Sequence, residues 1–220
     1  MSASSGTGPG SDYTASHTTL RGPFGIGTMM WGTTGLDRRI NRYLIPDETL
    51  RRIRDEAVRA GVTFFDTAEG YGGGTSEIRL RRLGLPRAGC VVATKFLPTL
   101  WRWSEASFIR ALRASNTRLG VECCDVYFIH TPIHPRSPDV WVRAAARAVK
   151  LGLMKELGVS NFDAASIRAA LSSSTFDRPV ARRAAFTVFI SCLVTMYRLS
   201  NLFADRAGRL LREQYTSSEM

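Results

Sequence analysis

Five apolar segments that alternate with amphipathic helical patterns constrain the fold of this chain more than any other feature. The segments are predicted strands at residues 24–32, 62–66, 90–96, 125–130 and 156–162. The helical patterns occupy residues 46–61, 76–83, 104–119 and 139–151. Strands and helices that alternate over short connections form a parallel sheet, and near-continuous apolar strands indicate that both faces of the sheet are covered. The pattern therefore predicts an α/β fold.

Polar residues stand at or near the ends of four of these strands. The second, third and fourth strands carry Asp66, Lys95 and His130 there, and the fifth carries Ser160 and Asn161. An apolar core would not select these side chains, and in a β/α barrel the carboxyl ends of the strands converge on one rim. Because four unrelated coincidences are less plausible than one shared site, we expect these side chains to meet.

A tyrosine near the second strand suggests what such a site does. Tyr71 follows Asp66 by five residues, and a phenol can donate a proton when an ammonium such as Lys95 favours the phenolate. Asp66 would hold that ammonium in place, and His130 would orient a carbonyl or share the proton. A polarised carbonyl beside a proton donor is what hydride addition requires. The alternative is structural, because most strand-ending aspartates are turn or cap residues and most tyrosines are packing residues.

The distribution of charge and the spacing of possible metal ligands argue against two kinds of partner, nucleic acids and metal ions. The net charge is +11, but the 30 cationic residues, nearly all arginine, are scattered along the chain. We therefore attribute the positive charge to the overall amino-acid composition, and we expect no nucleic-acid partner. The four cysteines show no zinc-type spacing, and the three histidines are dispersed. The sequence therefore implies no metal, and the cysteine pattern is simplest in a reducing compartment.

The N-terminal segment and the hydropathy of the chain indicate where in the cell we expect the protein to be found. Residues 1–20 are rich in Ser, Thr and Gly and lack the apolar core of a secretory signal, so we expect a disordered tail. The longest apolar stretch, residues 184–197, is shorter than the ~20 residues that span a membrane. We expect a cytoplasmic protein without membrane association. An organelle such as a plastid is the alternative, because the tail is Ser-rich and acid-poor, although it is not Arg-rich.

Five motifs together resemble a known family. They are Gly25-Ile26-Gly27-Thr28, Phe65-Asp66-Thr67-Ala68 followed by Tyr71-Gly72, Ala93-Thr94-Lys95, Tyr127-Phe128-Ile129-His130 and Gly158-Val159-Ser160-Asn161-Phe162. In order, strand placement and spacing, residues 24–171 resemble the aldo-keto reductases. The resemblance implies an oxidoreductase without a metal, on a (β/α)8 barrel, that uses NADPH to reduce a small-molecule aldehyde or ketone.

The resemblance also implies a role for each matching residue. Tyr71 would be the general acid, Lys95 and Asp66 would promote its proton release, and His130 would orient the carbonyl. The implied cofactor contacts are Gly27, Thr28, Met29, Asp66, Ser160 and Asn161. The implied substrate contacts are Trp31, Tyr71 and His130.

The resemblance fades after about Leu171. We therefore expect an N-terminal tail over 1–20, a partial barrel over 21–171 and a divergent segment over 172–220, with a sixth strand at 186–194 and a sixth helix at 201–213. A barrel of five to six units exposes sheet edges that favour self-association. The phosphate contacts that the family places after its last strands are not recognisable, so we expect the chain to bind NADPH weakly or not at all. The alternative function is a catalytically inactive remnant or interaction protein.

Overall fold

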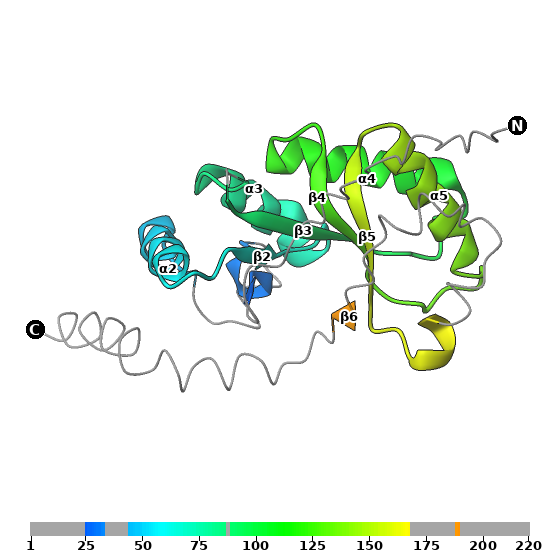
Figure 1. The fold of residues 1–220 in the computed structure, drawn as a ribbon, viewed down its shortest axis with the longest axis horizontal. Helices are drawn as coiled ribbons and strands as arrows, with labels where there is room; N and C mark the ends of the chain where they lie inside the picture. Colours follow the sequence, from blue (N-terminus) through cyan, green and yellow to red (C-terminus); the bar gives the residue numbers. More distant parts are fainter. Residues whose placement is uncertain (1–24, 34–43, 87–88, 168–187, 190–220) are drawn as a thin grey trace, which may run out of the picture.

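The computed structural model describes residues 25–33, 44–86, 89–167 and 188–189. Six parallel strands form one sheet in the order β1-β2-β3-β4-β5-β6 (Figure 1). The strands are β1 (Gly25–Gly27), β2 (Phe64–Asp66), β3 (Val91–Phe96), β4 (Cys124–Ile129), β5 (Met154–Ser160) and β6 (Val188–Phe189). Each strand pairs with the next one along the chain, as in a (β/α)8 barrel.

Helices follow the strands in the predicted alternation. They are α2 (Asp47–Arg59), α3 (Thr75–Arg82), α4 (Glu105–Leu119) and α5 (Asp139–Lys150), with short 3-10 helices η1 (Met29–Trp31) and η2 (Tyr71–Gly74). The ends of α4 show why its sequence is helical. Ser104 and Ser107 form a reciprocal capping box, and Gly120 ends the helix with a left-handed φ of 74°.

The first strand is shorter than the sequence predicts. β1 ends at Gly27, and η1 follows in place of an extended segment to residue 32. The chain turns because the Trp31 N–H donates to the Thr28 carbonyl at 2.9 Å, while the Thr28 N–H and hydroxyl both donate to the Asp66 carbonyl. These bonds fix the end of β1 against β2. The prediction of one strand over residues 24–32 is therefore wrong.

The C-terminal predictions are tested only at one point. Val188 and Phe189 pair in parallel with Val159 and Ser160, so a sixth strand lies within the predicted range of 186–194. The predicted helix at 201–213 and the predicted N-terminal tail lie outside the described residues, as does the rest of the segment 172–220.

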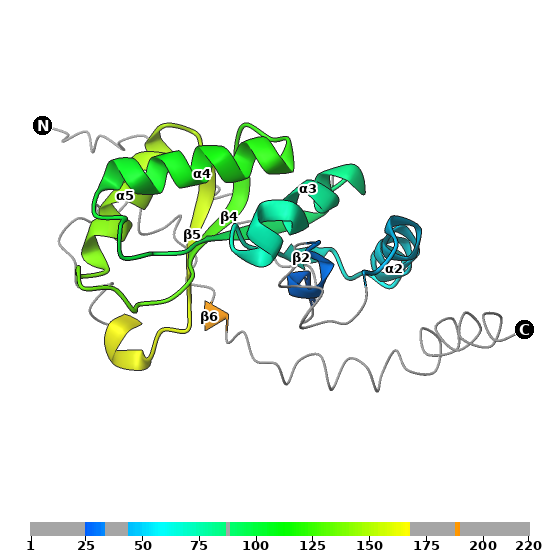
Figure 2. The ribbon, with the colours of Figure 1, turned by 180° about the vertical axis from the view of Figure 1, so that it is seen from behind.

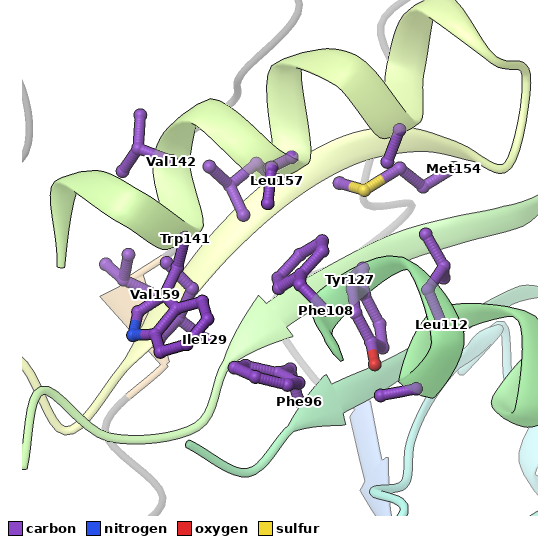
Figure 3. Close-up of a cluster of buried hydrophobic side chains, with 14 of the residues drawn as sticks. Phe96, Phe108, Leu112, Tyr127, Ile129, Trp141, Val142, Met154, Leu157 and Val159 are labelled. Carbon is purple, nitrogen blue, oxygen red and sulfur yellow. The ribbon is translucent and has the colours of Figure 1, made fainter. Parts of the chain in front are cut away.

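One core lies between the sheet and the helices α4 and α5. Figures 1 and 2 show these two helices along β4 and β5, and the helices contact each other. Figure 3 shows aromatic side chains filling the space between these layers: Phe96, Phe108, Tyr127 and Trp141. The Phe96 ring lies 4.9 Å from both the Phe108 and the Trp141 ring. Burial of large apolar side chains contributes about 1.5–3 kcal/mol each, so this layer is a main source of stability.

The opposite face of the sheet carries a second, smaller core. It comprises Phe64, Ala93, Val126 and Phe128, with Val91 packed against it. A Cβ added at Gly25 would lie 2.6 Å from Phe64 Cδ1, and one added at Gly158 would overlap the Phe128 ring. Gly25 pairs with Phe64 and Gly158 with Phe128 across neighbouring strands. These two glycines are therefore required because an aromatic ring occupies the space beside them.

Candidate active site

Four of the polar strand-end residues, Asp66, Lys95, His130 and Ser160, belong to the face of the sheet opposite the helices α4 and α5. Side chains alternate between faces along a strand, and Asp66 lies two residues after Phe64, a member of the smaller core. Lys95 likewise follows Ala93, and Ser160 follows Gly158. His130 lies immediately beyond β4, two residues after Phe128. The side chains therefore project from the carboxyl ends of neighbouring strands toward one region.

Lys95 is at the centre of this region. Its side chain is 0% exposed, yet each of its three N–H groups has an acceptor. The Nζ atom donates to Asp66 Oδ2 at 2.6 Å, to the Thr67 carbonyl at 2.8 Å and to Tyr71 Oη at 3.2 Å. A buried charge is tolerated only when it is paired and hydrogen-bonded. The acceptors therefore hold the ammonium in one position.

Asp66 is a buried carboxylate with one committed oxygen. Burial raises the pKa of the Asp66 carboxyl, and the adjacent Lys95 ammonium works against that rise. Oδ2 accepts from Lys95, whereas the buried Oδ1 has no hydrogen-bond partner among the described residues. Asp66 therefore orients Lys95 and retains one acceptor atom.

Tyr71 reaches the site from a glycine-rich turn. It begins η2, in which Gly72, Gly73 and Gly74 have left-handed φ values of 60°, 60° and 91°. Residues with a Cβ rarely adopt this conformation, so the glycine run is what allows the chain to turn back toward the sheet. The Lys95 Nζ atom also lies 4.7 Å from the centre of the Tyr71 ring. The phenol is thus held next to a cation by both its oxygen and its ring.

His130 completes the cluster. Its ring lies 5.8 Å from the Tyr71 ring in an edge-on arrangement. Burial, assisted by the Lys95 charge, lowers the pKa of His130 from 6.5 to about 4, so the imidazole is neutral at physiological pH. Its buried Nδ1 has no hydrogen-bond partner within the described part of the chain. The structure therefore brings the four predicted catalytic residues Asp66, Tyr71, Lys95 and His130 together.

The end of β5 adds two polar residues beside His130. Asn161 adopts a left-handed φ of 60°, which directs its amide back toward β4. Its Nδ2 atom donates to the His130 carbonyl at 2.8 Å and to Ser160 Oγ at 3.2 Å. Both donors of this amide are thus committed, and its carbonyl oxygen is the atom that remains for a ligand.

The residues predicted at the first strand differ in their surroundings. Thr28 is buried against Asp66, Met29 is 45% exposed, and a Cβ at Gly27 would contact nothing within 4 Å. Trp31 is 4% exposed and packs with α2 residues such as Leu50. The structure thus assigns the Trp31 side chain to a core, and its predicted role in a substrate pocket stays a prediction.

Several residues that hold the site together are not predicted from the sequence. Ser76, at the start of α3, bonds to the Thr28 and Thr67 hydroxyls at 2.8 and 3.0 Å and ties the ends of β1 and β2 together. Glu69 and Arg102 form an ion pair between the loops after β2 and β3. The only sequence feature that could have indicated a role for Glu69 is its position between Asp66 and Tyr71. Nothing in the sequence identifies Arg102 as its partner.

The comparison with protein families decides the assignment. The model of the aldo/keto reductase family matches residues 23–198 of this chain. The chain belongs to the aldo/keto reductase family. The match continues beyond Leu171, where the recognisable motifs end, and it includes strand β6. The family assignment confirms the resemblance that the sequence motifs indicate.

Curated aldo/keto reductases share the central part of the chain. An aldo-keto reductase of Mycobacterium sp. (strain JLS) is 34% identical over 134 residues, which cover 59% of this chain and 47% of that protein. The chloroplastic pyridoxal reductase of Arabidopsis thaliana is 30% identical over 155 residues, covering 64% of this chain and 41% of the relative. The aligned part of this chain thus spans less than half the length of these relatives.

Solved structures confirm the barrel class. A thermostable aldo-keto reductase bound to the inhibitor epalrestat superposes with a TM-score of 0.59 at 25% identity, over 84% of this chain and 75% of that one. An aldo-keto reductase from Klebsiella pneumoniae in complex with NADPH gives a TM-score of 0.59 at 23% identity, over 76% and 62%. The chain therefore has the α/β architecture of an aldo/keto reductase barrel, incomplete within the described residues.

Two further findings concern metals and membranes. Within the described ranges, no cluster of three or more His, Cys, Asp or Glu side chains could hold a metal ion. No helix in the same ranges is long and apolar enough to cross a membrane.

Proposed function

We propose that this chain reduces an aldehyde or ketone to the alcohol with NADPH as the hydride donor and Tyr71 as the proton donor. The observation that carries the proposal is the position of Tyr71 Oη, 3.2 Å from a fully buried Lys95 ammonium that is itself anchored 2.6 Å from Asp66. This position places a positive charge beside the atom on which negative charge would form during proton transfer, and burial of the Lys95 ammonium strengthens the electrostatic effect.

Tyr71, Lys95 and His130 have different roles at the carbonyl oxygen of the substrate. NADPH, when bound, supplies the hydride to the carbonyl carbon. The oxygen, which becomes negative, takes the phenol proton of Tyr71, and the Lys95 ammonium stabilises the phenolate that remains. Water then returns a proton to Tyr71. The neutral His130 imidazole carries one N–H that can donate to the same oxygen and orient the carbonyl.

Residues at the ends of β1, β2 and β5 offer polar groups that would hold the nicotinamide end of NADPH. Asp66 Oδ1 is a buried acceptor with no hydrogen-bond partner in the described ranges. It would accept a hydrogen bond from a hydroxyl group of the ribose. Ser160 and the side-chain carbonyl oxygen of Asn161 would form hydrogen bonds with the carboxamide group of the nicotinamide. Gly27, Thr28 and Met29 would line the same side at the end of β1. Residues 168–187 and 190–220, in which the sequence shows no recognisable phosphate contacts, lie outside the described residues.

The test combines turnover with binding. The 220-residue chain is assayed for aldehyde-dependent NADPH oxidation, and NADPH binding is followed by nucleotide fluorescence. Tyr71→Phe is expected to lower kcat by about 10²–10⁴-fold, because a general acid contributes that much, while NADPH binding stays unchanged. Tyr127→Phe is the matched control, because the Tyr127 hydroxyl is buried in the helix-side core without a partner in the described ranges.

One outcome tests the role of Tyr71, and another separates the two candidate functions. Turnover that survives Tyr71→Phe removes the phenol from its role. A wild-type chain that neither binds NADPH nor reduces any aldehyde supports the alternative, a catalytically inactive remnant or interaction protein.

A further inference from the structure

The loop that carries Tyr71 is held by a charged contact that the proposed chemistry does not use. Glu69 lies two residues before Tyr71, and its carboxylate pairs with Arg102 on the loop after β3. Glu69 Oε2 accepts from Arg102 Nη2 at 3.0 Å, and Oε1 accepts from Arg102 Nη1. The side chains are 11% and 23% exposed. This is a partly buried, two-point contact, which is stronger and more directional than an exposed ion pair.

The same carboxylate also bonds to the backbone just after Lys95. Glu69 Oε1 accepts from the Leu97 N–H at 2.6 Å, and the Glu69 N–H donates to the Lys95 carbonyl at 3.4 Å. The side chain and the backbone of Glu69 thus attach the Tyr71 loop to the end of β3. Tyr71 lies two residues after Glu69, and Lys95 is itself one of the two points of attachment on β3 and its following loop.

Arg102 is in turn fixed to β3. Its Nη1 atom donates to the Leu97 carbonyl at 2.9 Å, and its guanidinium lies 5.0 Å from the centre of the Phe96 ring. Phe96 belongs to the core beneath α4 and α5 (Figure 3). The guanidinium therefore links the Tyr71 loop to a rigid part of the molecule, and only its planar fork can make these contacts at once.

We propose that the Glu69–Arg102 ion pair is a positioning device that sets the Tyr71 phenol against the Lys95 ammonium. In this role the pair acts only through the placement of Tyr71. This role rests on the proposed function of Tyr71 as the proton donor. A displacement of about 1 Å in a reacting group can cost about 10²-fold in rate, so loss of the pair is expected to reduce kcat.

A double-mutant cycle on kcat tests the proposal. Arg102→Ala is expected to lower kcat about 10- to 100-fold with the KM for NADPH unchanged, and Arg102→Lys is expected to restore only part of the loss. In a Tyr71→Phe background, Arg102→Ala is expected to have no further effect, because the residue acts through the phenol. Arg143→Ala is the matched control, since Arg143 pairs with Asp139 and Glu105 on α5 and α4, away from the site.

Rescue adds a second readout. Guanidinium at millimolar concentration is expected to restore part of the kcat of Arg102→Ala and none of the kcat of Arg143→Ala. A general loss of stability would not respond in this way. If Arg102→Ala lowers kcat equally in the wild-type and Tyr71→Phe backgrounds, or leaves it unchanged in the wild type, the positioning role is wrong.

Hydrogen exchange separates this proposal from the proposed function. Arg102→Ala is expected to speed exchange of the Leu97 amide and of residues 69–74, whereas Arg143→Ala leaves both unchanged. A chain without any turnover refutes the proposed function, yet faster exchange in that chain still supports the attachment of the loop. Unchanged exchange in Arg102→Ala overturns the attachment whether or not the chain is active.

Discussion

At the scale of single residues, Lys95 determines how the site is organised. It is fully buried and donates to a carboxylate, a carbonyl and a phenol on the adjacent segment. Removing one partner of a buried ion pair leaves the other charge without compensation, which costs more than the pair itself contributes. The predicted effect of a substitution therefore depends on whether Asp66 is changed at the same time.

Lys95→Met is expected to lower the free energy of unfolding by about 3–5 kcal/mol, because it leaves the Asp66 carboxylate buried and unpaired. The double variant Lys95→Met with Asp66→Asn is expected to recover much of that loss. Urea denaturation at neutral pH measures both effects.

Lys155→Met supplies the control for this prediction. Lys155 also pairs with an aspartate, Asp125, at 2.6 Å, but its side chain is 56% exposed. An exposed pair is worth about 0–1 kcal/mol, so this variant is expected to change the stability little. Equal losses for Lys95→Met and Lys155→Met would contradict the role assigned to burial.

The sequence indicates which strand-end residues lie together, but it does not indicate the neighbours that hold them. Asp66, Lys95 and His130 are recognisable because polar side chains at the ends of apolar strands are unusual. The Glu69–Arg102 pair is not, because its partners lie 33 positions apart and arginines are spread along the whole chain. Trp31 is assigned to a pocket through resemblance alone, and local sequence does not show that its ring turns into the core beside α2.

At the scale of the elements, close packing between strands decides which glycines are required. Gly25 and Gly27 both lie in β1, but only Gly25 has an aromatic ring beside it. The sequence shows two glycines, Gly25 and Gly27, in this strand. It does not tell which glycine serves which purpose, because this depends on the register with β2.

Gly25→Ala is expected to destabilise the fold by about 1–3 kcal/mol, because its Cβ would lie 2.6 Å from Phe64 Cδ1 and overpack the smaller core. Gly27→Ala is the control, since an added Cβ there meets nothing within 4 Å. Thermal unfolding of both variants measures the difference. If the two variants melt at the same temperature, the Phe64 ring moves aside readily and the contact is not a constraint.

At the scale of the whole molecule, the alternation of strands and helices predicts the architecture, because periodicity and chain order suffice to define a parallel sheet. Individual boundaries are harder to predict, as β1 shows. Its end depends on bonds from Thr28 to Asp66, and such contacts form only when distant segments have already met. The family match to residue 198 likewise extends further than the motifs alone indicate.

The burial of His130 makes the stability of the molecule depend on pH. The pKa of His130 is lowered from 6.5 to about 4 in the fold, so below pH 6.5 the unfolded chain binds a proton that the folded chain does not. This contribution to stability is therefore fully present above pH 6.5 and is lost as the pH falls toward 4. At about 1.36 kcal/mol per pKa unit, the loss approaches about 3 kcal/mol.

Urea denaturation of the wild type and His130→Gln between about pH 7 and about pH 4.5 measures this contribution. The wild type is expected to lose more stability than the variant over that interval, because the glutamine side chain has no proton to gain. Parallel pH profiles would show that the histidine is not held neutral by the fold.

The commitment of all three Lys95 N–H groups has a consequence for chemical labelling. The chain contains only three lysines, and the other two, Lys150 and Lys155, are exposed. An amine-reactive reagent needs a free, accessible nitrogen, so it will label those two in the native protein and reach Lys95 only when the strand ends separate. Mass analysis of the Lys95 peptide over time would then report the opening of the site itself, without any substrate or cofactor present.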